Sequence, residues 1–405
     1  MLPKRFVYPS PGFSHYWTEG VGKELLKKID DIPSKEAIEE NGKLLMQYDV
    51  IGDNVITEVF EKMGFHRAGQ LIDQALNNGI ESIENPPQSL VQLFAEADNI
   101  PQWLDADLLK TGAQFCQRAG ASALIVLRNY CLMGGYESSA INKPLIYTQA
   151  LKKGAAKRMA ETVEFWVNVT GQNAMQRNAI GFKSAIKVRL MHAYARAAIQ
   201  KTPGWNNDLW GLPINQGDMV ATNLGFSLVF IEGLKTLGIK PTGKEIKGVL
   251  HLWKYIGYLL GISAEMLPDT EKEAIESLYK WTITQSAADE DTKALAEALV
   301  LEPLTASFPK YLWQKKLMIK AHLAYSHYFL GERACTTMAL PDTRLKYYPY
   351  VVAFINSTVG FFIPRQISVT TGRKRQEIIK TLFLRSHAHN VVKGPHPVAG
   401  AASSK

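Results

Sequence analysis

The spacing of hydrophobic residues is that of α-helices over almost the whole chain. Apolar side chains recur every three to four positions, and no segment of strand length alternates between apolar and polar residues. Helices are predicted at residues 34–49, 54–78, 88–97, 105–133, 149–169, 182–200, 216–237, 243–261, 269–286, 291–300, 311–330, 346–360 and 374–387. This pattern predicts an all-α protein.

Glycine and proline fall where these helices should end, as at Gly134-Gly135, Pro203-Gly204 and Pro268. Residues 1–30 are aromatic and rich in Pro and Gly, which predicts an extended N-terminal arm. Residues 391–405 are small and polar, which predicts a disordered tail. Because the chain has no internal repeat and no low-complexity linker, we expect residues 31–390 to form a single large helical domain.

Composition narrows the class of protein. Apolar residues make up 46% of the chain, enough for a sizeable core, and the net charge of +8 favours anionic surfaces without specifying one. No zinc-finger spacing, RNP-like motif or dense basic block is present, so we expect no nucleic-acid partner. The widely spaced Cys116, Cys131 and Cys335 predict neither a disulfide framework nor a metal site, and they suit a reducing compartment.

The sequence also bears on location. The N-terminus, MLPKRFVYPSPGFSHYW, has no secretory apolar region of about 7–15 residues, and the longest apolar run, Ala121–Leu127, is too short to span a bilayer. We therefore expect a cytoplasmic protein. The segment Arg373–Arg385 is cationic with an apolar face. It could lie on an anionic membrane surface as a peripheral contact or pack on the domain as a terminal helix, and hydropathy does not decide between them.

The predicted helix at 182–200 carries two opposed polar stripes. Lys183 and Lys187 fall on one side, whereas Arg189, His192 and Arg196 fall nearly opposite. If this helix packs in a core, one stripe must face an interior polar site or a ligand. The Arg-His-Arg stripe is the better interior candidate.

Arginine side chains keep their protons, so Arg189 and Arg196 need anions if they are buried. Haem carries two propionates, and a neutral imidazole such as that of His192 is a common iron ligand. The alternative is a helix that lies over a surface groove, with both arginines paired to acidic side chains and the hydrogen bonds of the histidine satisfied without a ligand. Helix geometry alone favours this alternative.

A second helix adds a candidate pocket. In the segment 154–169, Arg158 and Thr162 lie one turn apart on a face that also holds Phe165 and Trp166. An arginine and a hydroxyl on an apolar face would suit a small polarised ligand such as bound oxygen. The alternative is a solvated Arg158 with Thr162 filling a gap in the core.

Several motifs occur in a characteristic order. They are Ala97–Trp103, Lys157–Thr162 with Phe165-Trp166, Val188–Ala193 with Arg196, Pro213–Val220, Leu234–Ile239 and Tyr255–Ile262. Together they resemble the rubber oxygenase (latex-clearing protein) family and related prenyl-chain oxygenases. The resemblance covers roughly residues 95–270, and the ends of the chain match poorly.

The resemblance implies a helical domain with a globin-like core around haem b, extra terminal helices and dioxygen as co-substrate. The family's proximal iron ligand corresponds to His192, and its Arg and Thr near the haem correspond to Arg158 and Thr162. Members cleave a double bond of polyisoprene or of a prenyl side chain, giving aldehyde and ketone ends. The implied partner is therefore an apolar or isoprenoid small molecule; hydroxylation or epoxidation are further possible outcomes, and the oligomeric state is not indicated.

One position departs from the family. Some rubber oxygenases have a lysine just before the threonine that can occupy the distal position of the iron, and Glu161 stands there in this chain. A carboxylate could act as a base, ligate weakly or turn away, which puts a lysine-capped state in doubt. Two other functions are open: a haem-binding sensor or carrier without turnover, and a haem-free helical scaffold.

Overall fold

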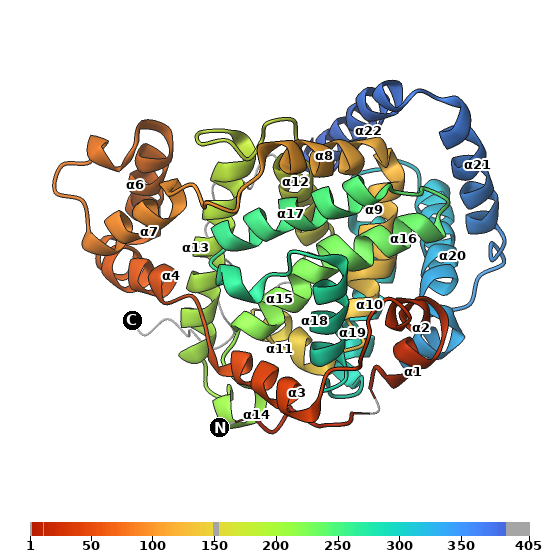
Figure 1. Cartoon of the computed structure of the whole chain (residues 1–405), viewed down its shortest axis with the longest axis horizontal. Coiled ribbons are helices and arrows are strands. Elements are labelled where there is room, and N and C mark those ends of the chain that lie inside the picture. Colours follow the sequence, from red (N-terminus) through yellow and green to blue (C-terminus); the bar gives the residue numbers. More distant parts are fainter. Residues whose placement is uncertain (1, 11, 149–153, 386–405) are drawn as a thin grey trace.

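The computed structural model describes residues 2–10, 12–148 and 154–385, and all regular secondary structure within them is helical (Figure 1). The predicted all-α class is confirmed. The α-helices are α1 (Ser14–Thr18), α2 (Gly20–Leu26), α3 (Lys35–Gly42), α4 (Val50–Val55), α5 (Glu61–Met63), α6 (Phe65–Asn78), α7 (Gln88–Asp98), α8 (Ala106–Arg118), α9 (Gly120–Val126), α10 (Met133–Gly135), α11 (Ser139–Tyr147), α12 (Ala155–Val169), α13 (Ile180–Gln200), α14 (Asn207–Trp210), α15 (Gln216–Leu224), α16 (Phe230–Thr236), α17 (Gly243–Leu259), α18 (Glu271–Thr282), α19 (Glu290–Thr305), α20 (Leu312–Thr337), α21 (Tyr348–Phe362) and α22 (Arg365–Arg385).

Short helical segments of other pitch join some of these elements. The 3-10 turns are η1 (Lys43–Met46), η3 (Ile80–Ser82) and η6 (Ala264–Met266), and the π-helical segments are η2 (Ile56–Phe60), η4 (Leu127–Leu132) and η5 (Gly225–Val229). Each π segment continues an α-helix on both sides, so α4 to α5, α9 to α10 and α15 to α16 are three continuous helices. Such π segments are often found at functional sites.

Glycine divides two of the predicted helices. The helix predicted at 54–78 is interrupted at Gly64 (φ 77°), and the one predicted at 105–133 is interrupted before Gly120 (φ 54°). A positive φ costs glycine little but cannot continue a right-handed helix. The helix predicted at 311–330 is present, and a further helical stretch that was not predicted follows the non-helical Gly331 and ends at Thr337.

The first 30 residues are not simply extended, because they contain α1 and α2. Preceding them, the Arg5 guanidinium is buried and donates to both carboxylate oxygens of Asp218, at 2.6 and 2.8 Å, and to Gln285 at 3.0 Å. A buried ion pair of this kind attaches the segment to the helical body. The tail predicted at 391–405 lies outside the described residues.

The centre of the molecule is the crossing of α8 and α17. A Cβ atom added to Gly112 would lie 2.2 Å from the carbonyl oxygen of Gly248, and one added to Gly248 would lie 2.7 Å from the Gly112 nitrogen. The two backbones therefore touch directly, which no larger residue would permit. Fully buried large side chains, among them Trp166, Trp253 and Phe230, fill the surrounding core.

Helix α13 lies between two parts of the molecule. It contacts α12 and α17 on the side of the main core, and α4 on the side of the group formed by α4, α6 and α7 at one end (Figure 1). At the opposite end, α20 and α21 form the edge. A residue on α13 can therefore meet side chains from both parts.

Helix α22 contains the cationic segment at 373–385. It packs on α8, α9 and α12, where Gln376 donates to the Cys116 carbonyl at 2.9 Å and Arg373 donates to the Val167 carbonyl at 2.6 Å. Gln376 is fully buried. Of the two alternatives for this segment, the structure has the terminal helix packed on the domain.

Candidate functional site

Helix α13 places its two polar stripes in different environments. Arg189 and Arg196 are each only 2% exposed. Lys183 and Lys187, on the other side, reach polar side chains on the surface of α6. The stripe expected to face inward therefore does so.

Arg189 is held by two carboxylates from outside its own helix. Its Nε and Nη2 donate to the two oxygens of Asp49 at 2.7 Å each, and its Nη1 donates to Glu96 at 2.5 Å. Burial opposes the charged form, but the hydrogen bonds and charges of Asp49 and Glu96 outweigh it and raise the pKa of Arg189. Asp49 also caps α4 by accepting the Gly52 N–H at 3.1 Å.

Arg196 has a similar set of partners. Its Nη2 and Nε donate to Asp53 at 2.6 and 2.9 Å, and its Nη1 donates to the Ile214 carbonyl at 2.8 Å. Burial raises the pKa of Asp53 against the opposing effect of Arg196. The charge that a haem propionate was expected to balance is thus balanced at Arg189 and Arg196 by protein carboxylates, as the alternative predicted for the two arginines but not for His192.

His192 lies between these two arginines on the same helix face. Its Nδ1 is enclosed and has no hydrogen-bond partner among the described residues. Burial, followed by the charges of Arg196 and Arg158, lowers the pKa of His192 to about 4. The imidazole is therefore neutral at pH 7, with a ring nitrogen that the described fold leaves unused. A buried polar atom without a hydrogen bond lowers the stability of the fold by about 1–3 kcal/mol, so its presence needs a functional explanation.

A small cavity adjoins His192 on the side of Arg196. It holds about 10 Å³, close to the space of one water molecule. Its lining residues are Asp49, His192, Arg196, Ile214, Gln216, Met219, Leu260 and Gly261. Ile214 has φ 52°, an unfavourable conformation for a β-branched residue, and its carbonyl is held by Arg196. Strain of this kind, of about 1–3 kcal/mol, is often found near functional sites.

The α12 candidates are linked to one another along their helix. Arg158 Nη1 lies 3.2 Å from Glu161, and Thr162 donates its hydroxyl to the Arg158 carbonyl at 2.9 Å. The side chains of Arg158 and Glu161 are 35% and 38% exposed. Glu161 also pairs with Lys157 at 3.8 Å, so the carboxylate is engaged by cations of its own helix. The other N–H groups of Arg158 bond to no described residue.

The structure brings only some of the predicted residues together. Arg158 and Arg196 are close enough for their charges to act on His192, although they come from different helices. Asp49, Asp53 and Glu96 were not predicted as site residues. The sequence does show Asp49 and Asp53 one helical turn apart at the start of α4, but that spacing does not indicate what the two carboxylates bind.

Residues 118–356, more than half of the chain, match the protein-family model described as "ER-bound oxygenase mpaB/B'/Rubber oxygenase, catalytic domain". The chain belongs to this family. The matched region includes α12 and α13 entirely, whereas α4 and α7, which carry the carboxylates that neutralise Arg189 and Arg196, precede it.

One curated protein and one solved structure are similar to this chain. A rubber oxygenase of Streptomyces sp. (strain K30) is 26% identical over 253 residues, which cover 59% of this chain. The match spans only 60% of that relative's length. A solved structure of latex-clearing protein in the closed state superposes with a TM-score of 0.66 at 19% identity, covering 84% of this chain and 91% of that one, and supports the fold.

Among the described residues, no helix is long and apolar enough to cross a membrane. In the same part of the chain, no three His, Cys, Asp or Glu side chains gather where they could hold a metal ion.

Proposed function

We propose that this protein is a haem b-dependent oxygenase that cleaves or oxygenates an unsaturated, isoprenoid-like hydrocarbon chain with dioxygen. One observation carries the proposal: His192, within the family's catalytic domain, has a buried nitrogen without a partner among the described residues and a pKa of about 4. A metal ligand must offer a free lone pair, so a histidine that stays neutral at pH 7 fits an iron ligand.

The residues around His192 fit such a group in part. The 10 Å³ cavity beside Arg196 is far smaller than the roughly 300 Å³ or more of a typical ligand pocket, so it cannot receive a porphyrin. The charge of Arg158 acts on His192, so we place the group on the side of α12. Arg158 has N–H groups that bond to no described residue and could serve a propionate or a polarised ligand, whereas Arg189 and Arg196 are neutralised by carboxylates and would serve to position His192.

When bound, haem would supply the iron that activates dioxygen. His192 would orient the group through its lone pair, and the positive charges of Arg196 and Arg158 would keep a proton from competing for that nitrogen. The Thr162 hydroxyl is already donating to the Arg158 carbonyl, so it offers a lone pair to a ligand and donates only if that bond opens. Glu161, neutralised by Arg158 and Lys157, would need to leave them to accept a proton as a base.

The substrate class follows from the relatives and from the chemistry of an alkene. A hydrocarbon chain offers no charge to bind, so its affinity must come from burial of apolar surface, at about 25 cal/mol per Å². The related protein from Streptomyces is named a rubber oxygenase, which agrees with a polyisoprene-like chain.

An absorption spectrum of the purified full chain, reconstituted with haem b, tests the cofactor. We expect a Soret band in the wild type that is lost or strongly shifted in His192→Ala. The matched control is His66→Ala, which removes an exposed histidine from α6 and should leave the band unchanged. Oxygen consumption with a polyisoprene or prenyl alkene, followed by detection of carbonyl products, then tests the reaction.

Each outcome decides between functions. A wild type that binds no haem would favour the haem-free scaffold. The pairing of Arg189 and Arg196 with protein carboxylates is consistent with that function. Haem bound through His192 without oxygen uptake or products would favour a sensor or carrier. A Soret band that survives His192→Ala unchanged would refute the assigned ligand.

A further inference from the structure

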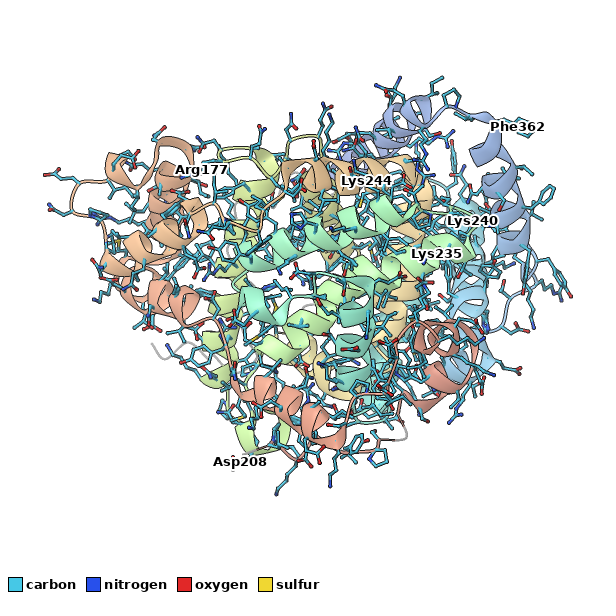
Figure 2. All side chains as sticks on the ribbon, viewed as in Figure 1. Arg177, Asp208, Lys235, Lys240, Lys244 and Phe362 are labelled. Carbon is cyan, nitrogen blue, oxygen red and sulfur yellow. The ribbon has the colours of Figure 1, made fainter. Side chains whose placement is uncertain are left out.

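Helix α21 exposes several large apolar side chains. Tyr347, just before the helix, is 79% exposed, and along the helix Val351 is 55%, Phe354 69% and Ile355 49% exposed. Figure 2 labels Phe362, 79% exposed, at the outer end of the same helix on the rim of the molecule. We call the surface formed by these five residues the α21 face. Contiguous exposed apolar surfaces mark interaction sites.

The opposite side of α21 makes the contacts with the protein, where the Tyr348 ring packs against Tyr325 and Val352 packs against the core. Asn356 donates to the Leu237 carbonyl at 2.9 Å, and Ser357 donates to the Gly238 carbonyl at 3.4 Å. An ordinary surface helix buries its apolar side and exposes its polar side. Helix α21 carries apolar side chains on both sides, so its exposed face is suited to a second apolar medium.

The surroundings of the α21 face are basic. Between Asp342 and Glu377 the sequence contains six Lys or Arg residues and no Asp or Glu; Lys346 and Arg373 pair with those two bounding acids, and Arg365 lies 3.6 Å from Glu245. Arg344 precedes α21 in the sequence and Arg365 follows it, and both side chains are exposed. Lys240, labelled in Figure 2, is exposed two residues beyond Gly238, whose carbonyl contacts α21. Negatively charged lipid headgroups are attracted to such flanks, by about 1 kcal/mol for each basic residue near the surface.

The same charges argue against a second copy of this chain as the occupant. A twofold contact through the α21 face would bring these basic flanks near one another, and like charges across an interface oppose association. The length of α21 argues for a helix that lies flat. Its 15 residues extend about 22 Å at 1.5 Å per residue, short of the roughly 30 Å of a bilayer core. Tyrosines such as Tyr347 and Tyr350 are typical of the boundary between lipid and water.

We propose that the α21 face docks on the surface of an anionic lipid bilayer, with the helix lying in the plane of the headgroups. The contact lies on α21, whereas the segment at 373–385 packs on the domain. This inference does not depend on the oxygenase proposal, because it uses neither His192 nor a cofactor.

Co-sedimentation of the full chain with vesicles tests the proposal. We expect binding to vesicles of phosphatidylcholine and phosphatidylserine in a 7:3 ratio, and clearly weaker binding to phosphatidylcholine alone. Phe354→Glu should weaken binding at least about tenfold, because it places a charge in the apolar layer. The matched control is Ile100→Glu, a change at a residue that is 74% exposed in the loop after α7, and it should bind as the wild type does.

A charge variant tests the basic flanks separately. Arg344→Gln and Arg365→Gln should each weaken binding to the anionic vesicles roughly fivefold and leave binding to neutral vesicles unchanged. Because Phe354 is exposed, Phe354→Glu should unfold at the wild-type temperature; Ile355→Glu serves as a second variant if it does not.

Four results would overturn the proposal. The first is a wild type that binds neither kind of vesicle, whether or not it binds an emulsion of polyisoprene instead. The second is a Phe354→Glu variant, or its substitute, that binds as tightly as the wild type. The third is equal binding to neutral and anionic vesicles. The fourth is a wild-type dimer in light scattering that Phe354→Glu converts to monomer, which would identify the α21 face as a contact between copies.

Discussion

Replacing Asp49 with asparagine should destabilise the protein strongly without altering its shape. The side chain is 9% exposed and makes two hydrogen bonds to Arg189, which is 2% exposed. Asparagine keeps the size of Asp49 and its ability to cap α4. The change therefore removes mainly the charge, leaving Arg189 with Glu96 alone. Breaking a buried ion pair by removing one partner costs about 3–5 kcal/mol, and Coulomb's law at an effective dielectric constant of about 20 gives roughly 4 kcal/mol at about 4 Å.

The assay is urea denaturation at pH 7 followed by far-ultraviolet circular dichroism. The matched control is Asp73→Asn, which removes the partner of Lys187 on the same helix α13. That pair is 2.6 Å long, like the buried one, but its side chains are 52% and 53% exposed. An exposed pair contributes at most about 1 kcal/mol, because water screens it. Equal losses of the free energy of unfolding in Asp49→Asn and Asp73→Asn would refute the reasoning that burial sets the strength of the Arg189 pair.

Two other predictions concern packing and pH. Gly112→Ala should lower the free energy of unfolding by about 1–3 kcal/mol, because a Cβ there would lie 2.2 Å from the Gly248 carbonyl oxygen. As a control, Gly69→Ala, in a helix with open space around it, should raise the free energy of unfolding by about 0.5–1 kcal/mol. Thermal unfolding that ranks the two variants in the opposite order would contradict the close crossing of α8 and α17. Burial and a nearby arginine hold the pKa of His322 well below its ordinary value, so the unfolded chain takes up a proton first as the pH falls below about 6.5. The free energy of unfolding then falls toward acid by up to about 1.4 kcal/mol per pH unit. His322→Gln should make the urea midpoint depend less on pH between pH 7 and 5. An unchanged dependence of the midpoint on pH would show that His322 does not titrate in this way.

Local patterns in the sequence determined the helical class and the chemistry of α13. Hydrophobic periodicity depends on residues three and four apart, so the helices could be predicted, and the same geometry put Arg189, His192 and Arg196 on one face. The motifs in α12 and α13 were also local enough to point to the family. Helix ends were less predictable, because Gly64 and Gly120 adopt their positive φ values only in the context of the packed fold.

The tertiary structure decided what these helices face. Arg189 meets Asp49 and Glu96 across 140 and 93 residues of sequence, and no periodic pattern reports a contact at such separations. The direction of the α21 face was equally hidden, since periodicity locates an apolar stripe but not the medium that receives it. Whether a charge is neutralised or an apolar surface is covered depends on neighbours that folding brings in from distant parts of the sequence.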